Sequence, residues 1–270
     1  MPVIATQRLR LRSTDLLQIL AFMVLIVGIV WSLLQGAENL GYNWQWTRVP
    51  RYLVTSGADG GWALGPLLQG LRLTLLITAI SLVCSFLIGL CCALMRLSNS
   101  VMARFISVVY LEAVRNTPLL IQIFIIYFVF APILDLGRVT SAILALSLFE
   151  GAYASEIIRA GILAIPKGQW EASASLGMTR YQNYRFIVLP QALRQMIPPL
   201  TSQGISLIKD SALVSTIAIY DLTMQGQQII SETFLTFEIW FTVAAIYLSV
   251  TLSLSLLVKY LETQLPIYQR

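Results

Sequence analysis

The feature that most constrains this fold is a series of long stretches without a single charged residue. Asp, Glu, Lys and Arg are all absent from residues 16–37, 73–95, 116–134, 139–149 and 239–258. A helix that crosses the hydrocarbon core of a bilayer needs about 20 predominantly apolar residues. Only helices and closed barrels satisfy their own backbone hydrogen bonds there. We therefore expect an all-α integral membrane protein.

Two of the expected spans need a further argument. Residues 195–220 are uncharged except for Lys209 and Asp210. The short run at 139–149 is long enough only if its helix continues through Glu150 and Glu156. With that extension the sequence predicts six transmembrane helices.

The composition excludes several functional classes. Hydrophobic residues make up 57% of the 270 positions and charged residues only 11%, whereas a soluble domain has about a quarter charged residues. The absence of histidine removes histidine-based catalytic triads and most zinc sites. The three cysteines lie within residues 84–92 without a CxxC spacing, so we expect no metal or cofactor in this chain.

Basic residues predict the orientation in the membrane. With the N-terminus in the cytoplasm, eleven of the 18 Lys and Arg residues fall in inside segments and four in outside segments. Cytoplasmic loops carry such an excess, so both termini are expected inside. The net charge of +5 is then a topology signal and does not indicate nucleic acid binding.

The same reading divides the chain into segments. We expect a cytoplasmic tail at 1–15, a first membrane helix at 16–37 and an external segment rich in aromatic residues and glycine at 38–66. The run at 16–37 is too long for a signal peptide and lacks a suitable cleavage site, so we interpret it as an uncleaved anchor. The last residues, 263–270, form a second cytoplasmic tail.

Seven charged residues lie in or at the ends of predicted spans, and five of them are candidates for a functional role. Retaining a charge at membrane depth is costly, and such residues often mark a path for a polar solute. The candidates for a substrate path are Glu150, Glu156, Arg159, Lys209 and Asp210.

Charge pairs at helical spacing offer an alternative interpretation of some of these residues. Glu156 and Arg159 are three residues apart, as are Glu112 and Arg115, and residues at that spacing meet on one helix face. Paired charges of this kind could serve bundle packing alone. Lys209 and Asp210 are adjacent and point about 100° apart on a regular helix, so either the helix is irregular there or each meets a different partner.

A polar segment at 166–190 lies between two apolar spans. Pro166 can start a helix over 168–176, and Gly177 can stop it. The side chains at 172–175 are all small, which lets another surface approach the helix backbone closely. The spacing of Thr179 and Gln182 matches a capping box at the start of a second helix.

The second helix is expected to end near Val188, because Pro190 disfavours helix at the residue before it. The segment is then two short helices joined by a glycine turn, within a predicted cytoplasmic loop at about 163–194. Such a unit either docks into a partner protein or packs on its own bundle.

The spacing of particular residues in this loop resembles that of a known family. Permease subunits of bacterial ABC importers carry the pattern E-A-A, three residues, G, nine residues, I-x-L-P. The residues that match it, with serine in place of the second alanine, are Glu171, Ala172, Ser173, Gly177, Ile187, Leu189 and Pro190.

Other stretches resemble the polar amino acid branch of that family, the histidine/glutamine-type permeases. They read RNTPLLIQIFIIYF, GAYASEIIRAGILAIPKGQ and KDSALVSTIA. The resemblance covers 67–262 and implies a five-helix permease core, to which the helix at 16–37 is an N-terminal addition.

Several partners follow from the resemblance. It implies that the loop at 166–190 is a coupling helix that docks into a cytoplasmic ATPase dimer. It also implies a second permease subunit, identical or homologous to this one. It also implies an external amino-acid-binding protein, an amino acid substrate and a place in the bacterial inner membrane. The chain has no GxxxxGK[ST] loop, so ATP and magnesium are expected on the partner ATPase and this subunit is expected to be non-catalytic.

Two other functions can be weighed against this one. An ion-coupled secondary amino acid transporter would account for the charges within spans but leaves the spaced loop residues unexplained. An intramembrane aspartyl protease is disfavoured, because Tyr220-Asp221 supplies only half of the required pair.

Overall fold

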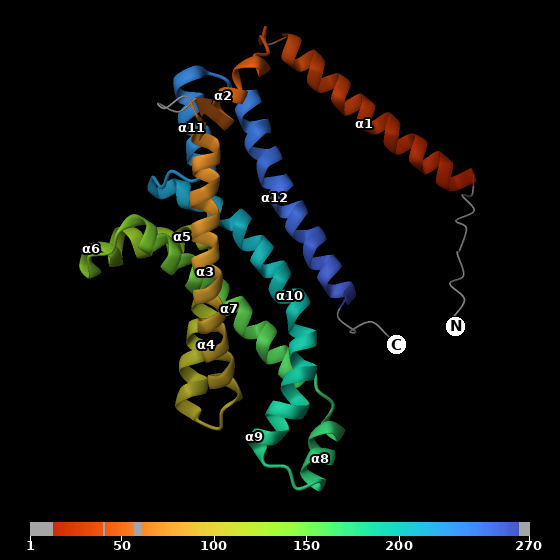
Figure 1. Ribbon diagram of the computed structural model, residues 1–270, viewed down its shortest axis with the longest axis vertical. Helices are drawn as coiled ribbons and strands as arrows, with labels where there is room; N and C mark the ends of the chain where they lie inside the picture. Colours follow the sequence, from red (N-terminus) through yellow and green to blue (C-terminus); the bar gives the residue numbers. More distant parts are fainter. Residues whose placement is uncertain (1–12, 40, 57–60, 265–270) are drawn as a thin grey trace. The chain divides into compact units, whose positions relative to one another are not determined.

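The computed structural model describes residues 13–39, 41–56 and 61–264 (Figure 1). It divides into two compact units, Met1–Gln45 and Trp46–Arg270. The predicted cytoplasmic tails at 1–15 and 263–270 lie almost entirely outside the described residues, so their placement stays a prediction.

The first unit contributes one helix, α1 (Ser13–Asn39). It contains the whole of the predicted first span at 16–37, and its residues Leu17–Ser32 form an apolar helical stretch. The sequence thus predicts this helix correctly.

The second unit begins with short elements in the region predicted to be external. They are η1 (Trp46–Arg48), α2 (Pro50–Leu53) and an antiparallel pair of strands, β1 (Val54–Ser56) and β2 (Trp62–Leu64), in which Thr55 pairs with Ala63. The expectation of a purely helical chain misses these strands, because three-residue strands are too short to show a period-2 pattern.

The remaining elements are helical and follow in chain order. They are α3 (Pro66–Leu97), α4 (Val101–Arg115), α5 (Leu119–Phe124), η2 (Ile125–Phe130), α6 (Ala131–Leu134), α7 (Arg138–Leu163), α8 (Lys167–Ser175), α9 (Arg180–Asn183), η3 (Tyr184–Val188), α10 (Leu189–Asp210), η4 (Ser211–Ile217), α11 (Leu222–Thr233) and α12 (Thr236–Gln264).

Three of these helices are long and apolar enough to cross a membrane. They are α3, α7 and α12, and a fourth span is possible if the bent pair of α4 with Leu119–Leu134 counts as one. In Figure 1, α3 runs from the end that carries α2 and α11 towards the end that carries α8 and α9. Three spans, or four, are fewer than the six expected, so the count of six is not confirmed.

The third predicted span, at 116–134, is not a straight helix. The chain bends by 107° between α4 and the segment Leu119–Leu134. Pro118 has no backbone N–H and cannot continue the α4 ladder. Gln122 satisfies part of the broken end, because its side-chain amide donates to the carbonyls of Val114 (2.8 Å) and Thr117 (2.9 Å).

The fifth predicted span, at 195–220, is also interrupted. The α-helix ends at Asp210 and a 3-10 segment, η4, follows it to Ile217. Lys209 and Asp210 are the last two residues of the α-helix, so the irregular segment begins directly after them.

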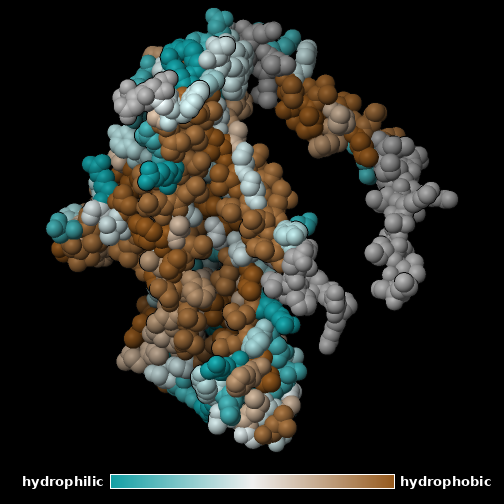
Figure 2. Space-filling model, in the orientation of Figure 1, coloured by the Kyte–Doolittle hydropathy of each residue, from teal (hydrophilic) through white to brown (hydrophobic). Residues whose placement is uncertain are grey.

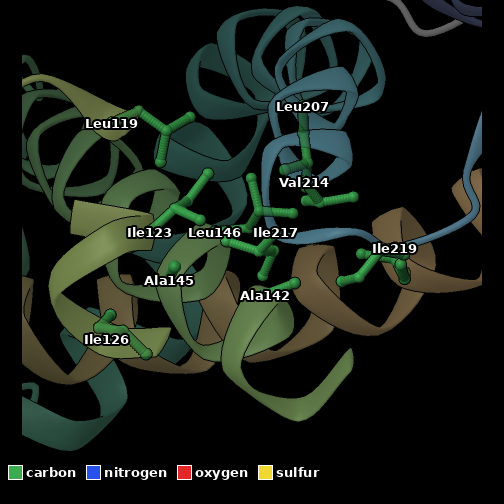
Figure 3. Close-up of a cluster of buried hydrophobic side chains, with 11 residues drawn as sticks. Leu119, Ile123, Ile126, Ala142, Ala145, Leu146, Leu207, Val214, Ile217 and Ile219 are labelled. Carbon is green, nitrogen blue, oxygen red and sulfur yellow. The ribbon is translucent and has the colours of Figure 1, made fainter. Parts of the chain in front are cut away.

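The interrupted segments are covered by a hydrophobic core. Side chains from α5, α7 and the α10–η4 region converge in Figure 3. The buried members of this core are Ile77, Leu119, Ile123, Ile126, Ala142, Ala145, Leu146, Leu207, Val214, Ile217 and Ile219. Irregular backbone at membrane depth is tolerated where protein buries it, and this core provides that cover.

A second contact zone lies at the α11 end of α3. Asp221 caps α11 by accepting a hydrogen bond from the Met224 N–H (2.8 Å), and the Leu222 N–H donates to the Thr74 hydroxyl of α3 (3.1 Å). Tyr247 of α12 donates to the Asp221 carboxylate (3.5 Å). Hydrogen bonds therefore join α3, α11 and α12 where their polar groups are buried.

Helices α3 and α7 approach each other closely at Gly89. A Cβ at this position would lie 2.7 Å from the Ala154 Cβ and 3.0 Å from the Gly151 carbonyl oxygen. The backbone of α3 at Gly89 therefore lies directly against Ala154 and the backbone of α7, a close approach that small residues allow in membrane bundles.

Gly89→Ala is expected to destabilise the protein, because the added methyl group meets backbone that cannot move away easily. Overpacking of this kind costs about 1–3 kcal/mol. The measurement is thermal unfolding of the detergent-purified chain. Gly168→Ala in α8, where a Cβ would meet nothing within 4 Å, is the matched control, and equal melting temperatures for the two variants would contradict the packing argument.

Candidate functional site

The polar segment forms a compact two-helix unit at one end of the bundle (Figure 1). The first helix, α8, ends where Gly177 adopts the left-handed conformation, with φ of +72°. Thr179 and Gln182 then form the predicted capping box, with both reciprocal hydrogen bonds present. The glycine turn and the start of the second helix are therefore as the sequence predicts.

The end of the second helix differs from the prediction. Beyond α9 the chain continues as the π-helix η3 and enters α10 without a break, although Pro190 was expected to end it near Val188. Pro190 lies in the first turn of α10, where proline is tolerated, and Leu189 keeps helical dihedral angles of −60° and −44°. The rule for the residue before proline is a tendency, and here the continuous helix overrides it.

Most of the residues of the spaced pattern lie on the surface of this unit. Glu171, Ala172 and Gly177 are exposed, as are Leu189 and Pro190. Beside them, Ala174 and Ser175 add small exposed side chains. In Figure 2 hydrophilic residues gather at the end of the bundle that carries α8 and α9. The surface of α8 is therefore open to close approach by another molecule.

The inner side of the unit is anchored to the bundle. Ser173 is buried and donates its hydroxyl to the Trp170 carbonyl (2.8 Å). The Trp170 and Tyr184 rings pack edge to face at 5.3 Å and so join α8 to η3. Both rings pack against a buried apolar cluster made of Ala93, Ile158, Ile162, Ile165, Val188, Ala192 and Met196.

Of the residues expected along a substrate path, Glu150 is the most deeply buried. Only 2% of it is exposed, and its Oε2 accepts a hydrogen bond from the Gln203 side-chain amide of α10. Its Oε1 is buried and has no hydrogen-bond partner. The Asp210 carboxyl, near the end of α10, is close enough to interact with Glu150.

A pocket of about 580 Å³ opens beside this carboxylate. Helices α3, α7, α10 and α12 line it, mostly with apolar side chains, and Glu150 with Gln203 and Thr201 supplies polar groups. The neighbouring Lys209 is exposed. Glu150 and Asp210 therefore belong to one polar group, and Lys209 points away from the buried side of α10.

Glu156 belongs to a separate group. Its carboxylate forms salt bridges with Arg96 of α3, Arg115 of α4 (3.7 Å) and Arg159 of its own helix (3.3 Å). The expected pair of Glu156 with Arg159 is thus confirmed. The other expected pair is not formed, because Arg115 contacts Glu156, while Glu112 accepts a hydrogen bond from the Asn116 side chain (2.8 Å).

Sequence reasoning did not identify Gln203 or Arg96 as partners of these carboxylates. Gln203 is uncharged, and Arg96 lies 60 positions before Glu156, so neither helical spacing nor charge within a span points to them. Among these contacts, only the Glu156–Arg159 pair is predictable from the sequence, because the two residues are three positions apart on one helix.

The pattern of one known family matches most of the chain. The family described as "Binding-protein-dependent transport system inner membrane component" matches residues 85–265. The chain belongs to this family. It is therefore the multi-pass inner-membrane component of a transport system, and the family's components work with an ATPase and a binding protein.

Individual relatives within the family are permeases for amino acids. The permease is 38% identical over 210 residues to the glutamine transport system permease protein GlnP of Escherichia coli K12, covering 76% of this chain and 96% of the relative. It is 41% identical over 206 residues to the L-cystine transport system permease protein TcyB of Bacillus subtilis 168, covering 75% of this chain and 88% of the relative.

Solved structures of amino acid ABC transporters also resemble this chain. An amino acid ABC transporter crystallised with histidines is 38% identical, with a TM-score of 0.70, over 74% of the permease and 94% of that chain. The MetNI methionine ABC transporter in an inward-facing form shares the fold, with a TM-score of 0.63 over 74% of the permease and 95% of that chain, at 23% identity.

Gln203→Leu is expected to lower the free energy of unfolding by about 1–3 kcal/mol, because it leaves the buried Glu150 carboxylate without its hydrogen-bond donor. Glu150→Leu combined with Gln203→Leu is expected to cost less than the sum of the two single substitutions. Thermal unfolding of the purified single and double variants measures this. Strict additivity would show that the two side chains do not interact.

Proposed function

We propose that this permease is a transmembrane subunit of an ATP-driven importer of polar amino acids. It receives mechanical work from a separate cytoplasmic ATPase through residues 166–190. The observation that carries the proposal is the two-helix unit itself. Its exposed α8 surface presents Glu171 and Ala172, and the left-handed Gly177 closes the helix with the spacing of the family pattern.

The geometry of the loop supports a coupling role. Small side chains on the outer surface of α8 allow a partner to approach closely, and the inner surface is fixed to the bundle through Trp170, which packs against the buried apolar cluster. A force applied to α8 would therefore reach the bundle and would not be absorbed by a loose linker. Residues Ile187, Leu189 and Pro190 complete the unit where it joins α10.

The partners are proposed from the family. They are an ATPase dimer that carries ATP and magnesium, a second permease subunit, identical or homologous, and an external amino-acid-binding protein. The permease domain spans 67–262 with α1 as an addition, and both termini face the cytoplasm. Closure of the ATPases moves the coupling loops and opens the path outward, and hydrolysis resets it.

The proposed substrate path runs past the ionisable residues of the spans. Glu150 and Asp210, with Lys209 beside them, form its first part, and Glu156 with Arg159 forms its second. The unpartnered Oε1 of Glu150 beside the apolar pocket supports this, since a buried acceptor without a donor can receive one from a passing solute. The relatives named for transport of glutamine, of L-cystine and of glutamate and aspartate support a polar amino acid as the solute.

An ion-coupled secondary transporter is the less favoured alternative. It would use the same buried carboxylates but has no role for the exposed, precisely spaced residues of α8. Uptake driven by ATP in proteoliposomes without an ion gradient separates the two, and a panel of amino acids with the cognate binding protein identifies the substrate.

The orientation predicts reporter behaviour. A reporter fused after Gly177 is expected to be cytoplasmic and one fused after Ser231 external, because basic residues concentrate on the Gly177 side. Protease accessibility in sealed vesicles reads this out. An external reporter after Gly177 would remove the coupling proposal.

Glu171→Lys and Gly177→Asp are expected to leave the chain inserted in the membrane but to reduce ATPase docking and uptake. A Cβ at Gly177 is disfavoured in the left-handed conformation by about 1–2 kcal/mol. Lysine at 171 reverses the charge on the exposed surface of α8.

The measurement pairs amino acid uptake with recovery of the ATPase on a tagged permease. Lys167→Gln, which removes a charge at the first residue of α8 but leaves the pattern intact, is the control. Normal uptake and normal ATPase recovery in both variants would rule out this docking surface.

A further inference from the structure

The salt bridges around Glu156 join three helices at one carboxylate. Arg96 comes from the last turn of α3, Arg115 from the last turn of α4 and Arg159 from α7 itself. The side chain of Glu156 is 27% exposed, and those of Arg96 and Arg159 are 20% and 30% exposed. Partial shielding from water makes such contacts stronger than those between fully exposed charges.

This group lies next to the coupling loop. Glu156 precedes the end of α7 at Leu163 by seven residues, about 10 Å of helix, and α8 begins at Lys167. A displacement of the loop can therefore reach α3 and α4 through the part of α7 that holds Glu156.

An apolar cluster fixes the same part of α7 to its neighbours. Ile158 and Ile162 of α7 pack with Ala93 of α3 and with Val188 and Met196 on the far side of the loop. A Cβ at Gly161 would lie 2.5 Å from the Met196 Cγ, so α7 and α10 are in close contact here. The cluster and the salt bridges together make the loop, the end of α7 and the end of α3 one block.

The block has a weak point on its membrane side. Pro198 and Pro199 lie two and three residues after Met196 within α10. Neither has a backbone N–H, so the carbonyls of Arg194 and Gln195 lose their helical donors. Helix α10 is therefore easier to bend just beyond the packed cluster than within it.

We propose that Glu156 is a positioning residue for energy coupling: by holding Arg96 and Arg115, it makes α3 and α4 move with the coupling loop, while α10 bends at Pro198–Pro199. This inference rests on the proposed function. Without the Glu156 carboxylate, three arginines face one another with no anion between them, and like charges at this distance repel. The loop would still dock, but its displacement would reach α4 less fully and would reach α3 only through apolar packing.

The test compares transport with ATP hydrolysis in the complete complex. Glu156→Gln keeps the side-chain shape and removes the charge. In proteoliposomes with the ATPase and binding protein, ATPase recovery and hydrolysis are expected to stay within about twofold of the unmodified complex. The amino acid transported per ATP is expected to fall about tenfold.

Arg96 provides an independent pair of variants in case Glu156→Gln does not fold. Arg96→Lys keeps the positive charge and is expected to retain the transport ratio, whereas Arg96→Gln is expected to lower it. Arg104→Gln is the control, because Arg104 is exposed on α4 and is not among the arginines that contact Glu156.

Three results would overturn the inference. One is an unchanged ratio in both Glu156→Gln and Arg96→Gln, and another is a proportional loss of uptake and hydrolysis. The third is a change confined to the substrate KM, which would assign Glu156 to the substrate path alone. A different result would refute the proposed coupling function itself: normal uptake by the Glu171→Lys variant.

Discussion

The requirement that every buried polar group find a partner inside the protein shapes this structure more than any other constraint. Hydrocarbon offers no hydrogen bonds, so interrupted helices persist only where the protein covers them. The bend after α4 uses the Gln122 amide, and the η4 segment packs into the core around Leu146 and Val214. Three arginines surround the Glu156 carboxylate, whereas Glu150 follows the rule only in part, because Gln203 donates to its Oε2 and its Oε1 has no partner.

The two ends of the bundle are joined differently. Near α11, neutral hydroxyl and backbone groups around Asp221 and Thr74 link α3, α11 and α12. Near the loop, ion pairs and a small apolar cluster link α3, α4, α7 and α10. Between the ends lies the pocket beside Glu150. A transporter that alternates its access needs firm ends around a deformable middle, and this distribution of contacts is consistent with that need.

Local signals in the sequence predict local structure well. The uncharged runs locate α3, α7 and α12, and the capping box of Thr179 with Gln182 is formed as its spacing indicates. Bends and breaks are predicted poorly. The run at 116–134 is apolar throughout, yet it leaves α4 at 107°, because hydropathy carries no information on direction. Long-range pairs such as Arg96 with Glu156 have no signal in a single sequence, since the fold alone brings them together.

The π-helix η3 has a consequence for how this loop can vary in length. A π-helix closes its hydrogen bonds over one more residue than an α-helix and commonly occupies a single widened turn. Residues Tyr184–Val188 thus accommodate an extra residue between Gly177 and Pro190 without turning α10 about its axis. A chain shortened by one residue there could close the turn as an ordinary α-helix and keep the same α10 face towards the bundle. A one-residue gap in an alignment at 184–188 would then leave the three-dimensional register of the permease unchanged.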